Sequence, residues 1–177
     1  YGVYLSSSNN NTINTNTITN NNEYGLHLYS SSNNAINNNT FFHGGIFMGI
    51  RSTYHNSIVN NTVNGKPLLY LEGKSNIIID SNNQAGQIIL VNCTSITICN
   101  QVITNTSMGI LLSDTHNCLI TNNTLKNNTL GISFYSSSNT TINASTITNN
   151  DWSGIDLYYS SNTTINASTI TNNDWSG

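Results

Sequence analysis

Apolar and polar residues alternate along this chain in short phrases that recur every 22 or 23 residues. One phrase has a small residue followed by apolar residues at alternate positions, as in "GISF" at 131–134 and "GIDL" at 154–157. A second phrase places polar residues three and eight positions after an apolar residue, with a second apolar residue at position five; an example is Ile142, Ser145, Ile147 and Asn150. A period of two predicts β-strands, and the absence of a 3.6-residue period excludes a helical repeat.

A unit of 22–23 residues has room for about three short strands. It is too short for a four-stranded propeller blade and lacks the leucine spacing of a leucine-rich repeat. We therefore expect an all-β fold, a parallel β-helix (β-solenoid) of about eight coils. Equal positions of successive coils should then form columns, and the exact copy of residues 137–154 at 160–177 should stack on its original.

Polar uncharged residues dominate the composition, and the predicted fold has to account for them. The 177 residues include 36 Asn, 23 Ser and 23 Thr. In a stacked fold, Asn side chains at equal positions hydrogen-bond along the axis, and Asn tolerates the left-handed conformation of a sharp corner. The abundance of Asn therefore has a structural explanation.

Charge excludes two classes of partner. Only 6% of the residues are charged and the net charge is −3, which is unsuited to binding nucleic acid or an anionic membrane surface. No apolar run approaches the ~20 residues that a membrane span needs. Both ends fall within a repeat unit, so we interpret residues 1–177 as a single β-helix domain from a longer repeat protein.

The middle of the chain departs from the repeat. Residues 64–83 contain turn-forming and charged residues, and we expect an irregular insert on one side of the helix. Beside it, the strands at 87–91 and 109–112 lose the alternation, so Ile89, Val91 and Leu111 should point outward as an apolar interface. Two explanations remain open: the insert covers them, or they meet another subunit.

Candidate catalytic and metal-binding groups are sparse. Polysaccharide-cleaving enzymes need two or three acids on one face, but the seven acids here fall in different phrases or repeat one turn. The histidines do not form a cluster with the spacing of metal ligands; they are His27, His43, His55 and His116. We therefore predict no catalytic residues, no metal and no cofactor, and a protein that is not an enzyme.

The sequence has candidates for two covalent modifications, disulfide bonds and N-linked glycans. The three cysteines, Cys93, Cys99 and Cys118, are an odd number; buried free thiols are favoured over a Cys93–Cys118 disulfide, whose geometry would be poor. Asn-x-Ser/Thr sequences are common, and Asn139 and Asn162, on polar turns, are the preferred glycosylation sites.

Aromatic residues give the best candidate for a binding surface. Tyr29, Tyr135 and Tyr158 take the same outward slot of a strand, and Trp152 and Trp175 repeat one coil apart. Such columns either stack on themselves or contact a carbohydrate or protein partner. Both alternatives stay open.

The stretch "NNTLKNNTLGISFYSSSNTTI" (122–142) resembles the NosD-like repeats of right-handed parallel β-helices, within the pectin-lyase-like, carbohydrate-binding and sugar-hydrolysis group. Residues 61–93 are similar to a segment of archaeal cell-surface proteins of this kind. The resemblance implies a right-handed coil. It leaves the activity open, because members of the group range from surface polymers to enzymes.

These patterns favour a non-catalytic extracellular structural module of a cell-surface layer, sheath or filament. Duplication of a coil lengthens a rod, whereas an active site gains nothing from it. We expect a homo-oligomer or head-to-tail filament that carries glycans. The alternatives are a carbohydrate-binding module and, less favoured, a polysaccharide lyase or hydrolase.

Overall fold

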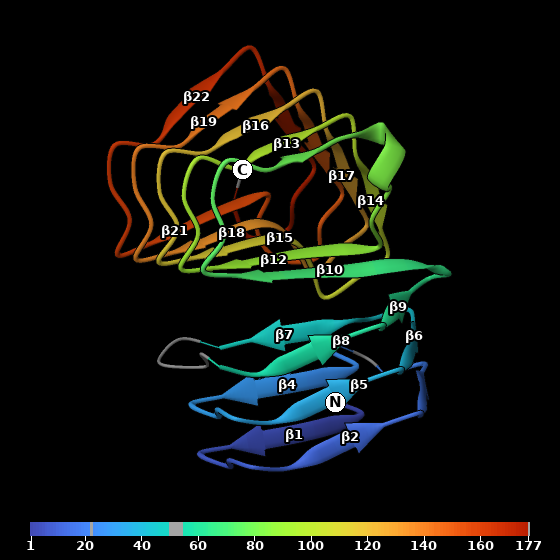
Figure 1. The fold of residues 1–177 in the computed structure, drawn as a ribbon. Helices are drawn as coiled ribbons and strands as arrows, with labels where there is room; N and C mark the ends of the chain where they lie inside the picture. Colours follow the sequence, from blue (N-terminus) through green and yellow to red (C-terminus); the bar gives the residue numbers. More distant parts are fainter. Residues whose placement is uncertain (22, 50–54, 177) are drawn as a thin grey trace.

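The structure is a computed structural model that describes residues 1–21, 23–49 and 55–176. Its elements are strands, apart from the 3-10 turn η1 (Ser81–Asn83). The strands form coils, which confirms the predicted parallel β-helix, but the coils are arranged as two stacks rather than one rod (Figure 1). Among the described strands, every pair is parallel except β9 with β10.

The first stack is built from three sides. One side contains β1 (Val3–Ser6), β4 (Leu26–Tyr29) and β7 (Ile46–Met48). The second side contains β2 (Thr12–Asn14), β5 (Ala35–Asn37) and β8 (Ser57–Val59). The third side contains β3 (Thr17–Thr19), β6 (Thr40–Phe42) and β9 (Thr62–Val63), and it continues through the antiparallel β9–β10 pair into the second stack.

The second stack also has three sides. The side that continues from β9 contains β10 (Lys66–Glu72), β12 (Gln87–Val91), β15 (Met108–Ser113), β18 (Leu130–Tyr135) and β21 (Ile155–Tyr158). The next contains β11 (Ile78–Ile79), β13 (Thr97–Cys99), β16 (Leu119–Thr121), β19 (Thr141–Asn143) and β22 (Thr164–Asn166). The last contains β14 (Val102–Thr104), β17 (Thr124–Lys126), β20 (Thr146–Thr148) and β23 (Thr169–Thr171).

Equal positions of neighbouring coils pair in register, as the repeat predicted. Ile98 pairs with Ile120, Ile120 with Ile142, and Ile142 with Ile165. Alternation sends these side chains into the coil, and the first three are fully buried. Each coil therefore covers the apolar surface of its neighbour.

The corners explain the paired polar residues of the sequence. Asn122 has φ 54°, a left-handed conformation that Asn adopts at low cost. The following residue, Asn123, is buried, and its Oδ1 accepts the Gln101 N–H at 2.9 Å. Asn123 Nδ2 donates to the Ile98 carbonyl at 3.0 Å, and its own N–H donates to Ser145 Oγ at 3.2 Å. One residue of the pair makes the bend, and the next accepts a backbone N–H from the preceding coil.

The same arrangement recurs at other corners, so the prediction of polar columns is confirmed. Corner N–H groups donate to the side-chain oxygen of the equivalent residue one coil on, over distances of 2.8–3.2 Å. The bonds run from Asn11 to Asn34, Asn16 to Asn39, Asn39 to Asn61, Cys93 to Thr115, Thr106 to Asn128 and Asn128 to Asn150.

The chain itself covers the outward apolar residues, which corrects the prediction that they form an exposed apolar interface. Ile89, Val91 and Leu111 are buried in one cluster with Ile46 and Met48 of the first stack. The first stack thus packs against the outer face of β12 and β15. Leu68 of the 64–83 segment belongs to the same cluster and Tyr70 packs against it, so no second subunit is required. Figure 1 shows β7 as the strand of the first stack that lies nearest this face.

Two hydrogen bonds of the Gln87 side chain connect the stacks at this junction. The Ile46 N–H donates to Gln87 Oε1 at 2.9 Å, and Gln87 Nε2 donates to the Ile46 carbonyl at 2.6 Å. The backbone approaches so closely here that a Cβ at Gly45 would lie 2.5 Å from Gln87 Oε1. Gly45 therefore allows the two stacks to meet.

Residues 64–83 were expected to be an irregular insert but contain the start of the second stack. Gly65, at φ 78°, lies in the turn between β9 and β10. β10 is a full member of the sheet and pairs in parallel with β12. At the end of the segment, Asp80 caps η1 by accepting the Asn82 N–H at 2.9 Å.

The junction makes a testable difference between two leucines. Leu111→Ala should lower the free energy of unfolding by about 2–5 kcal/mol, because it opens a cavity between the stacks. Leu119→Ala, on an exposed face of β16, should cost less than about 1 kcal/mol. Chemical denaturation of both variants checks this, and equal small losses would show that the stacks do not pack together.

The corner bonds predict a ranking at a single position. Asn123→Leu leaves the Gln101 N–H without a partner and removes the side-chain donor to the Ile98 carbonyl, and it should cost about 2–4 kcal/mol. Asn123→Ser keeps an acceptor, as Ser145 does in the next coil, and should cost less than half as much. The measurement is the denaturation midpoint, and an Asn123→Leu variant as stable as Asn123→Ser would contradict the ladder.

Candidate functional site

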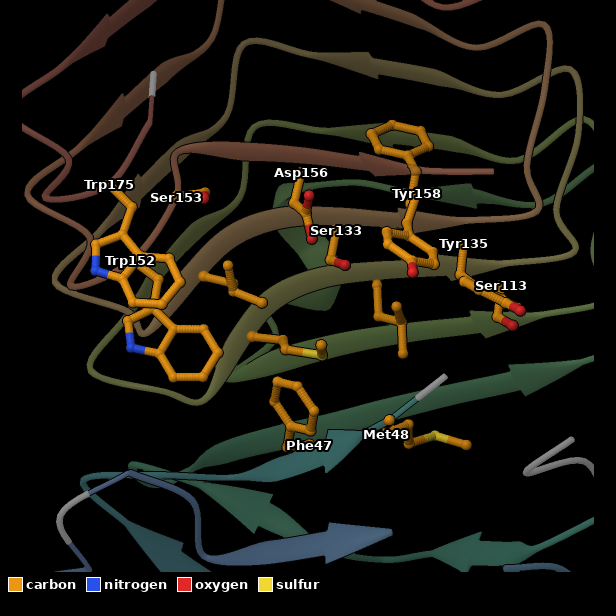
Figure 2. A pocket seen from close by; sticks show the side chains of 15 residues that line it. Phe47, Met48, Ser113, Ser133, Tyr135, Trp152, Ser153, Asp156, Tyr158 and Trp175 are labelled. Carbon is orange, nitrogen blue, oxygen red and sulfur yellow. The ribbon is translucent and has the colours of Figure 1, made fainter. Parts of the chain in front are cut away.

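A groove lies at the junction of the two stacks, between β7 and the outer face of β15, β18 and β21 (Figure 2). Its volume is about 330 Å³, and its lining is mainly apolar. Phe47 and Met48 come from the first stack; Leu111, Leu130 and Trp152 come from the second. Grooves of this kind are typical of small-molecule sites.

Strand register places the polar groups on the floor of the groove. Leu111, Ser133 and Asp156 form one outward column, because Leu111 pairs with Ser133 and Ser133 with Asp156. Ile89 lies under the first stack, Leu111 is buried against it and also lines the groove, and Ser133 and Asp156 line the groove in the next two coils. The same column is thus apolar where the first stack covers it and polar where the groove continues beyond the first stack.

Aromatic residues form two walls. Trp152 and Trp175 stack with ring centroids 5.3 Å apart and 7° between planes, and Tyr135 and Tyr158 stack at 5.9 Å and 19°. In Figure 2 the tryptophans lie on one side of Asp156 and the tyrosines on the other. The rings stack on one another, as one alternative predicted, and they also line the groove. Contact with a carbohydrate or protein partner stays a prediction.

Tyr29, the fifth predicted contact residue, lies elsewhere. It is on β4 of the first stack and is not among the residues that line the groove. Its ring lies 6.4 Å from that of His27. Tyr29 and Tyr135 share a slot in the repeat, but they belong to different stacks.

An aromatic cluster that the sequence did not predict contacts the residues of the groove. The fully buried Tyr24 stacks on Phe47 with a centroid separation of 4.1 Å, and Phe47 lies 6.5 Å from Trp152. His27 sits 4.8 Å from Phe47, and neither ring nitrogen has a hydrogen-bond partner within the described chain. Burial lowers the His27 pKa, so the neutral ring is favoured.

Two carboxyl groups have unusual surroundings. Asp156 is partly buried, and burial raises its pKa. It makes no hydrogen bond or ion pair with another described residue. Asp114 is at a left-handed corner, and its Oδ2 is buried without a partner in the described part of the chain. Burial raises the Asp114 pKa, and nearby His116 partly offsets the rise. These acids lie in different columns.

A second, polar pocket of about 190 Å³ lies between the stacks. It brings together Glu23, His43 and Asp151 with several Asn and Thr side chains. His43 has φ 50°, so the "HGG" phrase forms a strained corner. Across residues 1–21, 23–49 and 55–176, no three His, Cys, Asp or Glu side chains are grouped to hold a metal ion.

The remaining candidate residues are the three cysteines and the two predicted glycosylation sites. Cys93, Cys99 and Cys118 are free thiols, and Cys93 and Cys118 are buried, which favours the free-thiol prediction over the disulfide. Burial raises the pKa of both buried thiols. Asn139 and Asn162 are exposed at equivalent corners, where Asn162 Nδ2 donates to Asn139 Oδ1 at 3.2 Å.

Comparison with known proteins identifies the fold family. A family model described as a right handed beta helix region matches residues 1–86 and, again, 44–177, so the two matches together span the chain. No curated protein matches the chain. In the described residues, no helix has the length and apolar character required to cross a membrane.

Asp114 gives a pH-dependent prediction. The pKa of Asp114 is higher in the folded chain than in the unfolded chain, so the ionised carboxylate lowers the free energy of unfolding. This loss of stability is complete above the folded pKa and disappears below the unfolded pKa of about 3.9. Asp114→Asn should therefore raise the melting temperature at pH 7, with a smaller gain as the pH falls towards 4. Asp151→Asn, on an exposed turn, is the control. A loss of stability at pH 7 in Asp114→Asn would show that the carboxylate has a favourable partner.

Proposed function

The chain belongs to the right-handed β-helix family, and from this premise we propose a non-catalytic structural module of a cell-surface layer, sheath or filament. The observation that carries the proposal is the self-complementary coil. Residues 141–143 and 146–148 pair in register with their exact copies at 164–166 and 169–171. The first coil carries the same strand sequences, Thr-Ile-Asn at 12–14 and Thr-Ile-Thr at 17–19, and its strands lie at sheet edges, as do those of the last coil. Head-to-tail assembly would place the first coil of one copy on the last coil of another and repeat a contact that the chain already makes with itself.

The positions of the charged groups support a non-catalytic role. Glu72 accepts the His55 N–H at 2.9 Å and the Tyr70 hydroxyl at 2.7 Å, and Asp80 caps η1. Asp156 is the one acid that lines the groove among the described residues. Hydrolysis of a glycosidic bond requires a pair of carboxyl groups flanking the bond, so a lyase or hydrolase is the less favoured alternative.

The polar surface supports an extracellular location. Asn139 and Asn162 are exposed corner residues in Asn-x-Thr sequences on consecutive coils. Glycans at one or both would extend from the second stack without entering its core. A glycosylated surface rich in Asn, Ser and Thr suits a surface layer, whose outer face meets water.

Carbohydrate binding is a second candidate function, and the groove favours it. Trp152 and Tyr135 present planar rings on either side of Ser133 and Asp156. Flat aromatic faces offer apolar surface to a sugar ring, while hydroxyl and carboxylate groups bind its hydroxyls. Binding would be compatible with a structural role, because the groove lies at the junction and leaves the coil-to-coil contacts intact.

Removal of one repeat unit tests the structural proposal. Deletion of residues 137–159 joins Ser136 to Ser160 and removes one 23-residue unit, leaving one of the two identical copies. The shortened chain should fold cooperatively and form extended assemblies like those of the parent chain, because each remaining coil keeps its register. Negative-stain electron microscopy and sedimentation measure assembly, and circular dichroism measures folding.

Deletion of residues 137–147, about half a unit, is the matched control. It shifts the following strands out of register and should abolish cooperative unfolding. Isolated particles at every concentration of the parent chain, together with cleavage of a polysaccharide, would contradict the structural proposal.

A further inference from the structure

The groove contains one charged side chain among the described residues that line it. Asp156 projects from the outer face of β21, one coil beyond Ser133. No described Lys or Arg lines the groove, and Lys66 Nζ donates to the Val102 carbonyl of β14 at 2.9 Å. The site therefore has a negative centre within a mainly apolar surface.

No described cationic group lies in the groove to compensate the charge of this partly buried carboxylate. Removal from water disfavours the ionised form, which is why burial raises the Asp156 pKa. Neither a described backbone N–H nor a described side chain donates to it. A bound cation would supply the missing charge and hydrogen bonds, and hydrogen bonds between charged groups are stronger than neutral ones.

The aromatic walls favour the same ligand charge. Indole and phenol rings have electron-rich faces that attract an ammonium group within about 6 Å. Trp152 lies on one side of Asp156 and Tyr135 on the other (Figure 2). A ligand that lies between them would have apolar ring faces against the aromatic walls and a positive charge close to Asp156. Its hydroxyl groups would form hydrogen bonds with Ser133 and water.

We propose that the groove selects saccharides with a free amino group, that is, amino sugars whose nitrogen is not acylated. The ammonium group pairs with the Asp156 carboxylate, and the sugar ring lies against Trp152. Ser133, in the adjacent coil, accepts or donates a hydrogen bond at the same ring. This inference rests on carbohydrate binding as a function of the groove and specifies the class of sugar.

Isothermal titration calorimetry with three oligosaccharides of equal length tests the selection. The probes are β-1,4-linked oligomers of glucosamine, N-acetylglucosamine and glucose, each added to the full chain. Glucosamine oligomers should bind at least about 10-fold more tightly than the other two, which corresponds to one charge-assisted hydrogen bond.

Asp156→Asn should abolish this preference, and Asp151→Asn should keep it. Asp151 is on the preceding turn and lines the second pocket instead, so its variant changes net charge equally without altering the groove. Asp156→Asn should also unfold at the same or a higher temperature than the parent chain. A lower melting temperature would mean that the carboxylate already has a partner within the protein, which would overturn the proposal.

The outcomes separate this inference from the function on which it rests. Equal binding of all three oligosaccharides would overturn amino-sugar selection while leaving carbohydrate binding in place. No binding of any oligosaccharide would overturn both. A preference for glucosamine oligomers that persists in Asp156→Asn would assign the preference to the overall charge of the chain, and that too would overturn the proposal.

Discussion

The hydrogen bond between a corner N–H and an inward side chain of the neighbouring coil is the interaction on which the fold depends. At each corner the chain leaves the strand ladder, so a backbone donor turns towards a dry interior. An unpaired donor there would cost about 1–3 kcal/mol. Asn123 and Asn128 provide the acceptor, and the preceding residue, Asn122 or Asn127, makes the bend in the left-handed conformation. The Asn-Asn pairs are thus a consequence of stacking, and the same bonds fix the register that aligns the isoleucine columns.

The meeting of the two stacks creates the groove. After the β9–β10 turn the second stack presents the outer face of β12 and β15 to the first, and Ile89 and Leu111 fill the contact. The first stack covers only part of this face. Beyond the first stack, the column of Ile89 and Leu111 continues as Ser133 and Asp156. The covered apolar surface is therefore followed, within two coils, by the polar part of the groove. The stack-to-stack contact and the groove therefore occupy different parts of one sheet.

The sequence alone predicted the coil, its period, the isoleucine and amide columns and the exposed corner positions of Asn139 and Asn162, because these follow from local alternation and from repetition. It did not predict the junction. The broken alternation at Ile89 and Leu111 showed that something covers this face, but the covering strand β7 comes from a distant, less regular coil. For the same reason Tyr29 was grouped with Tyr135 by its slot, although the reversal near Gly65 separates them. The role of Phe47 in the groove had no signal in the repeat at all.

Amide hydrogen exchange measured by NMR at the corner positions tests the central claim most directly. Gln101, Thr106 and Asn123 each donate a backbone N–H to a side chain of the next coil. Their amides should exchange as slowly as those of the adjacent buried strand residues, Ile98 and Ile103. Exchange at the rate of a solvent-exposed turn would mean that the inward side chains do not accept these bonds, and the account of the fold would be wrong.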